Sequence, residues 1–91
     1  MRIDLLLKYL CLTKSRAQAK SLCDKHVVFL NHRPARASAT VKASDIITLH
    51  MPARQLTIEI LSLPRKQLSK SISPQYYQRL DSDDTENGSI L

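Results

Sequence analysis

The chain has 91 residues, of which 43% are hydrophobic, with one Phe and no Trp. A chain this short has room for one small domain with an aliphatic core. Two cysteines are too few for a disulfide-built scaffold, so we expect reduced thiols in a cytoplasmic protein. Charged residues interrupt the opening apolar segment, and no apolar run is long enough to cross a bilayer. We therefore expect neither a secretory leader nor a membrane contact.

The net charge of +6 is unevenly distributed. Residues 81–91 contain four acids and no base, which leaves residues 1–80 with 14 bases, four acids and a net charge of +10. A small domain this basic usually meets a polyanion, most often nucleic acid. A solvated basic surface that serves only solubility is the alternative.

The first predicted helix covers residues 3–12. Asp4 and Lys8 are spaced as an i,i+4 ion pair on its polar strip, and Asp4 suits the positive end of the helix dipole. Apolar residues at helical spacing form the face that we expect to be buried, namely Ile3, Leu6, Leu7 and Leu10.

A second helix begins at Ser15, which forms a capping-box pattern with Gln18 three residues later. Its buried stripe is predicted to consist of Ala19, Leu22 and Cys23. Arg16 and Lys20 lie one turn apart on the flank of that stripe. Because a flank position stays outside the core, we expect their replacement to leave stability nearly unchanged.

The rest of the domain is predicted to be a sheet. Strands are expected at 27–30, 46–50 and 55–61, because these segments are apolar or alternate in polarity. Turns separate them: Asn31 with His32, residues 43–45, and residues 51–54. The predicted fold is therefore α+β, with two N-terminal helices packed on a small, mostly antiparallel sheet.

The C-terminal part divides into two segments in this interpretation. Residues 64–80 form a basic linker and a short terminal helix, with Ser73 as its N-cap and Pro74 in its first turn. Residues 81–91 form an acidic, disordered tail. Residues 1–63 then make up the folded domain, with an added hairpin at its end.

Nothing in the sequence indicates a catalytic or cofactor site. Cys23, His26 and His32 lack a fourth ligand and a recognised metal-binding spacing. The single glycine lies in the tail, which excludes a glycine-rich phosphate loop. The acids of the basic region are scattered without a motif. We therefore expect a protein that is not an enzyme and needs no cofactor.

The basic residues near the second helix make a stronger case. A helix N-terminus attracts phosphate, and cationic side chains beside it add charge-assisted contacts. Lys14, Arg16 and Lys20 are placed in this way. Ser15 and Gln18 either cap the helix or donate to a phosphate or sugar. Arg33 and Arg36 flank the loop after Asn31, from which long side chains can reach the same ligand.

These segments resemble the alpha-L RNA-binding motif, the domain named for small-subunit ribosomal protein S-four. The resemblance covers residues 2–50, about half of the chain. It rests on "RID" at residues 2–4, "SRAQA" at 15–19, "VFLN" at 28–31 and "VKASD" at 41–45. The family usually has Gly where this chain has His26 and His32, at positions that need a left-handed backbone or a close approach.

The resemblance implies a function as well as a fold. Stand-alone members of this family are similar to the ribosome-associated heat-shock protein and its relative RqcP, which bind large ribosomal subunits holding stalled peptidyl-tRNA. By this resemblance the chain is expected to be a monomer that binds large-subunit rRNA in ribosome quality control, with peptidyl-tRNA as a further candidate contact. The expected RNA-binding residues are Arg2, Lys14, Ser15, Arg16, Gln18, Lys20, Lys25, Asn31, Arg33 and Arg36.

Three other functions stay open at this point. A DNA-binding module of the helix-turn-helix type would use the same two helices. A protein-interaction subunit would use the apolar excess of the first helix. A small metal or thiol enzyme has the least support, for the reasons given above.

Overall fold

The computed structural model describes residues 1–81. In chain order the elements are α1 (Ile3–Tyr9), α2 (Arg16–Asp24), β1 (Val28–Leu30), β2 (Arg33–Pro34), β3 (Ile46–Met51), β4 (Arg54–Ile60), the 3₁₀ helix η1 (Ser73–Tyr76) and β5 (Tyr77–Arg79). None of the helices in this part of the chain is long and apolar enough to span a membrane.

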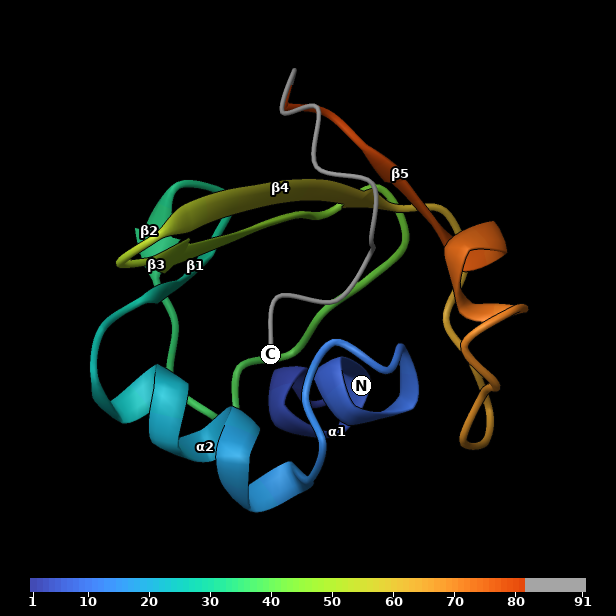
Figure 1. The fold of residues 1–91 in the computed structure, drawn as a ribbon, viewed down its shortest axis with the longest axis horizontal. Coiled ribbons are helices and arrows are strands. Elements are labelled where there is room, and N and C mark those ends of the chain that lie inside the picture. Colours follow the sequence, from blue (N-terminus) through green and yellow to red (C-terminus); the bar gives the residue numbers. More distant parts are fainter. Residues whose placement is uncertain (82–91) are drawn as a thin grey trace.

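The five strands form one antiparallel sheet in the order β2-β1-β3-β4-β5. Both α-helices lie on the same side of this sheet (Figure 1). In the central register Ile47 lies opposite both Leu30 of β1 and Ile58 of β4. Successive side chains of a strand point to opposite faces of the sheet, so every second residue of β3 and β4 turns an aliphatic side chain toward the helices. The observed architecture confirms the predicted α+β fold.

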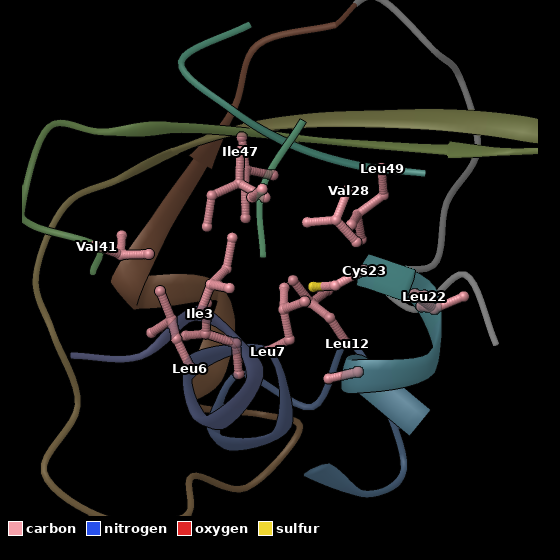
Figure 2. Close-up of a cluster of buried hydrophobic side chains, with 14 of the residues drawn as sticks. Ile3, Leu6, Leu7, Leu12, Leu22, Cys23, Val28, Val41, Ile47 and Leu49 are labelled. Atoms are coloured by element: carbon pink, nitrogen blue, oxygen red, sulfur yellow. The ribbon is translucent and has the colours of Figure 1, made fainter. Parts of the chain in front are cut away.

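The core fills the space between the helices and the inner face of the sheet (Figure 2). The predicted apolar face of α1 and the stripe of α2 are both buried, and Val41 closes one end of the cluster. The core contains no large aromatic group except Tyr77, so its stability depends on aliphatic packing. Within residues 1–81, no buried side-chain nitrogen or oxygen lacks a hydrogen-bond partner.

Helix α1 is shorter than the sequence predicts, because it ends at Tyr9 rather than near residue 12. Cys11 has a left-handed backbone, with φ 62°, and the amides of residues 12 and 13 both donate to the carbonyl of Leu7. The carbonyl groups of the last helical turn are taken by a distant segment, since Gln67 donates to those of Lys8 and Tyr9. The left-handed Cys11 thus ends the helix locally, and the contact with Gln67, which has no local sequence signal, adds a partner for the carbonyl groups of its last turn.

The segment predicted as a terminal helix folds differently. Its first residues form the 3₁₀ helix η1, and Ser73 lies inside this helix instead of capping it. The chain then extends as β5, in which Tyr77 is buried opposite Ile60 of β4. Burial of this ring and pairing with β4 favour an extended chain over further helix. The tail predicted to be disordered lies, apart from Asp81, outside the described residues.

The turn at Asn31 and His32 is confirmed, but the short strand β2 that follows it was not predicted. Leu30 pairs with Arg33 across a two-residue loop, and both loop residues have positive φ values, 50° and 70°. This is the pattern of a type I′ hairpin turn, for which Asn-Gly is the preferred sequence. Pro34 fits the outer edge of the sheet, where its missing N–H costs no ladder hydrogen bond.

Both histidines at the family's glycine positions adopt the backbone conformation that glycine would favour. The φ values are 61° at His26 and 70° at His32. These values lie in the left-handed region, where a residue with a Cβ atom has a conformational energy about 1–2 kcal/mol higher than in the right-handed region. The surrounding turns therefore hold these two histidines against a local conformational preference.

His32→Gly is expected to raise the free energy of unfolding by about 0.5–1 kcal/mol. The substitution removes the left-handed penalty but adds freedom to the unfolded chain, which offsets part of the gain. His32→Ala is the matched control, because alanine keeps the Cβ atom; it should stay within about 0.5 kcal/mol of the parent. Urea denaturation of the three proteins makes the comparison. A less stable glycine variant would show that the imidazole has a structural role.

Candidate nucleic-acid interface

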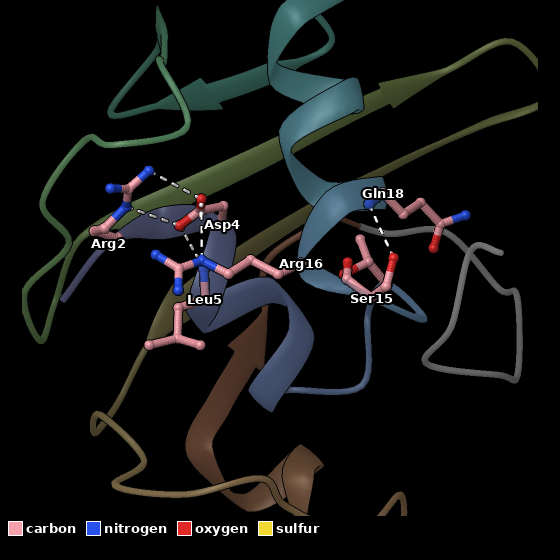
Figure 3. Close-up of polar contacts among 7 residues, drawn as sticks. Arg2, Asp4, Leu5, Ser15, Arg16 and Gln18 are labelled. Atoms are coloured by element: carbon pink, nitrogen blue, oxygen red, sulfur yellow. Dashed lines mark hydrogen bonds and ion pairs between the residues drawn. The ribbon is translucent and has the colours of Figure 1, made fainter.

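A buried carboxylate organises two arginines at the start of α1 (Figure 3). The Asp4 side chain is only 2% exposed and lies against Arg2, the residue before the helix, and Arg16, the first residue of α2. Arg2 donates from Nε at 3.2 Å and from Nη2 at 3.1 Å, and the Nε atom of Arg16 lies 3.3 Å from Oδ2. The amide of Leu5 donates to Oδ1 at 2.7 Å.

These contacts determine the charge state of Asp4. Burial alone raises the pKa of its carboxyl group, but the hydrogen bonds from Arg2 and Arg16, with the Leu5 amide, outweigh burial and leave the pKa below its ordinary value. Asp4 is therefore ionised at neutral pH. This arrangement corrects the predicted Asp4–Lys8 pair, because Asp4 points to the arginines and away from the polar strip.

The same geometry corrects the expectation that Arg16 is a free flank residue. Arg16 is an ion-pair partner of a buried group, so its removal leaves that group with one cation fewer. The side chains of Arg2 and Arg16 nevertheless remain 49% and 46% exposed. Each guanidinium thus uses one edge for Asp4 and presents the rest to solvent.

The N-terminal backbone brings a distant loop beside Arg2. Arg2 forms an isolated antiparallel bridge with Thr40. The amide of Ile3 donates to Ala39 at 2.8 Å, and the amide of Asp4 donates to Ala37 at 3.3 Å. Because residues 37–40 are fixed to the start of α1, Arg36 lies at the same end of that helix as Arg2.

An open groove of about 540 Å³ lies at this end of α1, and we refer to it as the Arg2 groove. Its charged lining is Arg2, Lys20, Asp24 and Arg36, and the remainder comes from Cys23, His26, Pro34, Ala35, Ala37 and Ser38. Three of the predicted RNA-binding cations therefore meet in one place, although they come from three separate segments. Arg16 adjoins them through the shared Asp4 carboxylate.

Two predicted contact residues, Ser15 and Gln18, act as helix caps. Ser15 Oγ accepts from the Gln18 amide at 3.0 Å, as the capping box predicts. Gln18 Oε1 accepts from the amide of Lys14 at 2.7 Å, one residue earlier than the motif requires. Both side chains thus fix the position at which Arg16 enters α2.

Asn31 also has a structural role in this fold. Its side chain accepts from the Ile46 amide at 2.9 Å and donates to Asp45 Oδ1 at 3.3 Å. Asp45 Oδ2 in turn accepts from the Lys42 amide at 2.9 Å. These bonds join the β1–β2 turn to the turn before β3.

The other predicted cations lie elsewhere on the surface. Lys25 and Arg33 are exposed, and neither lines the Arg2 groove. Lys14 lines a second groove near the end of α1.

The sequence interpretation missed His26 as a groove residue, and it missed the role of Asp4. The resemblance to a motif with Gly at position 26 was the available signal for the unusual histidine.

The groove chemistry favours binding over nucleophilic catalysis. Burial, with the carboxylates of Asp4 and Asp24, raises the pKa of the Cys23 thiol to about 11. The thiol is therefore protonated and unreactive at neutral pH. Across residues 1–81, no three His, Cys, Asp or Glu side chains are placed to hold a metal ion.

Fold and groove together define a small basic domain of the alpha-L type. No family model matches the chain. An RQC P-site tRNA stabilizing factor of Helicobacter pylori is 37% identical over 81 residues, covering 82% of this chain and 96% of the relative. The Bacillus subtilis protein of that name is 33% identical over 63 residues, covering 69% of this chain and 73% of the relative. The chain therefore belongs to the family of RQC P-site tRNA stabilizing factors.

A solved structure supports the fold independently. Heat shock protein 15 of Vibrio cholerae, whose structure is described as trimeric, matches with a TM-score of 0.83 at 24% identity. The match covers 88% of this chain and 81% of that protein. It confirms the alpha-L arrangement of two helices on an antiparallel sheet.

Asp4→Asn is expected to lower the free energy of unfolding by about 1–3 kcal/mol at pH 7, because it weakens hydrogen bonds to charged groups at a buried site. Asp24→Asn is the control, since this exposed carboxylate has no ion pair within residues 1–81 and its loss should cost less than about 0.5 kcal/mol. Chemical denaturation gives both values.

The pH dependence provides a second test of Asp4. Because the folded-state pKa lies below the unfolded value, near 4, the contribution of Asp4 is complete above that value. It is lost as the pH falls through the folded pKa. The stability difference between parent and Asp4→Asn should therefore shrink as the pH is lowered from 6 toward 2. A difference that does not change with pH would contradict the assignment.

Proposed function

We propose that this chain is a non-enzymatic RNA-binding factor that acts on the large ribosomal subunit in ribosome quality control. It would work as a monomer and would contact rRNA, with P-site peptidyl-tRNA as a further contact. The observation that carries the proposal is the convergence of Arg2, Lys20 and Arg36 in one groove, beside an arginine held by Asp4.

The groove suits an RNA backbone in its charge and in its rigidity. Arginine can hold phosphate oxygens through a planar fork of donors, and lysine adds a compact charge. Asp4 holds Arg2 and Arg16 in place before a ligand arrives, which reduces the entropy lost on binding. Structured RNA is recognised largely by shape, phosphate and 2′-hydroxyl contacts, so a rigid basic groove suffices without base-reading residues.

The relatives supply the setting for this groove. Their name describes stabilisation of tRNA in the P site, and this chain covers nearly the whole length of the Helicobacter pylori protein. An RNA-binding domain of the same size and fold is consistent with that activity. Tyr77 is buried against the sheet, so it has no place in the proposed contact.

Sedimentation of tagged protein through a sucrose gradient tests the ribosomal role. We expect enrichment with free large subunits, and we expect the enrichment to rise when translation is stalled. Protein that stays at the top of both gradients would contradict the proposal, and free tRNA and duplex DNA would then be tested as partners.

Lys20→Ala with Arg36→Ala tests the groove itself. Neither side chain is in an ion pair within the described residues, so folding should be preserved. Loss of two phosphate contacts should weaken binding to purified large subunits by about 5- to 30-fold near 0.15 M salt. Lys42→Ala with Lys66→Ala removes equal charge from exposed positions outside the Arg2 groove and should bind almost as the parent does. Equal affinity for the two variants would remove the groove from the binding surface.

A further inference from the structure

A second basic groove lies at the opposite end of α1. It has a volume of about 400 Å³ and is lined by three lysines, Lys8, Lys14 and Lys70, together with Gln67 and residues 11–13. None of these lining residues is an acid. We refer to this hollow as the Lys8 groove. Only Lys14 was among the cations that the sequence assigned to RNA binding.

The Lys8 groove exists because the segment after β4 returns to the end of α1. Gln67 Nε2 donates to the carbonyl of Lys8 at 3.0 Å and to that of Tyr9 at 3.3 Å. The amide of Leu68 donates to Tyr9 at 3.2 Å, and the Cys11 thiol donates to the carbonyl of Leu68 at 3.1 Å. These four contacts fix the segment on the helix, and its position next to α1 can be followed in Figure 1.

The docked segment brings Lys70 to two lysines that are distant in sequence. Lys14 and Lys70 are exposed, and Lys8 is partly buried at the C-terminal turn of α1. None of the three forms an ion pair within residues 1–81. Three ammonium groups around one hollow repel each other unless an anion lies between them. The groove is thus a place where a phosphate group gains attraction from several directions.

The two grooves lie at the two ends of the same short helix, with the Asp4 arginines next to one and Lys14 next to the other. Lys14 lines the Lys8 groove and is only two residues from Arg16, which pairs with Asp4, so one short segment of chain links the cations at the two ends of α1. An extended polyanion can reach the cations at both ends, whereas a small phosphate compound would occupy only one of the grooves. This arrangement favours the RNA backbone as the ligand.

We propose that the Lys8 groove binds backbone phosphate of the same RNA that the Arg2 groove contacts. The inference rests on the proposed function and adds a second point of attachment to it. Gln67 is a positioning residue in this account, because it holds the segment that carries Lys70. Two separated contacts would fix the orientation of the domain on its RNA, which a single groove cannot do alone.

The test compares double variants in binding to purified large ribosomal subunits over a series of salt concentrations. Lys8→Ala with Lys70→Ala should weaken binding by about 5- to 30-fold near 0.15 M salt and reduce the log–log salt slope by about two. The matched control is Arg65→Ala with Lys66→Ala. It removes the same charge from the same segment, but its residues line a different hollow and should change affinity less than about twofold.

The outcomes separate this inference from the proposed function. If the Lys8–Lys70 variant binds like its control while Lys20→Ala with Arg36→Ala binds weakly, the second groove is wrong and the proposed function stands. If neither groove's variant binds more weakly than its control, both fail. An equally weak result for the Arg65–Lys66 control would also overturn the inference, since general charge would then explain the loss.

Gln67→Ala provides a test that changes no charge. The variant should lose about as much affinity as Lys70→Ala, and adding Lys70→Ala to it should cause little further loss, because the lysine is already displaced. Circular dichroism and thermal unfolding establish that the variant is folded. Full additivity of the two substitutions would show that Gln67 does not position Lys70, and unchanged affinity in both single variants would overturn the role of Lys70.

Discussion

The carboxylate of Asp4 is the contact on which the arrangement of the basic surface depends. It is nearly inaccessible to solvent, and it is held by Arg2, Arg16 and the Leu5 amide at the start of α1. A buried charge needs such partners, because desolvation would otherwise favour its neutral form. The ion pairs join the start of one helix to the start of the next and fix the two guanidinium groups in place.

This constraint links the core to the surface. The apolar face of α1 places Asp4 at the edge of the core, and the sheet supports the loop that carries Arg36. Cations from three segments therefore gather without a dedicated binding loop. Each arginine is about half exposed, so one side chain serves both stability and the proposed contact with RNA. A small domain with one core has few other means of holding charged groups rigidly.

Sequence periodicity was enough to predict both helices, the strands β3 and β4 and the core, because helices and strands bury side chains at characteristic spacings. The strand β5, the pairing of Asp4 with Arg16 and the docking of Gln67 on the end of α1 were missed, since each is a contact between residues distant in sequence. The basic residues were predicted as a set. Which of them meet in the Arg2 groove, and that Lys8 and Lys70 join Lys14 in a second groove, depends on the three-dimensional path of residues 34–40 and 67–70.

Ultraviolet cross-linking of the protein bound to stalled large subunits, followed by mass spectrometry of the peptides, identifies the segments that contact RNA. If the Arg2 groove holds the RNA, we expect nucleotide adducts on peptides from residues 2–36, with the strongest signal around Lys20 and Arg36. Adducts confined to β3 and β4 would place the RNA on the sheet and contradict this expectation.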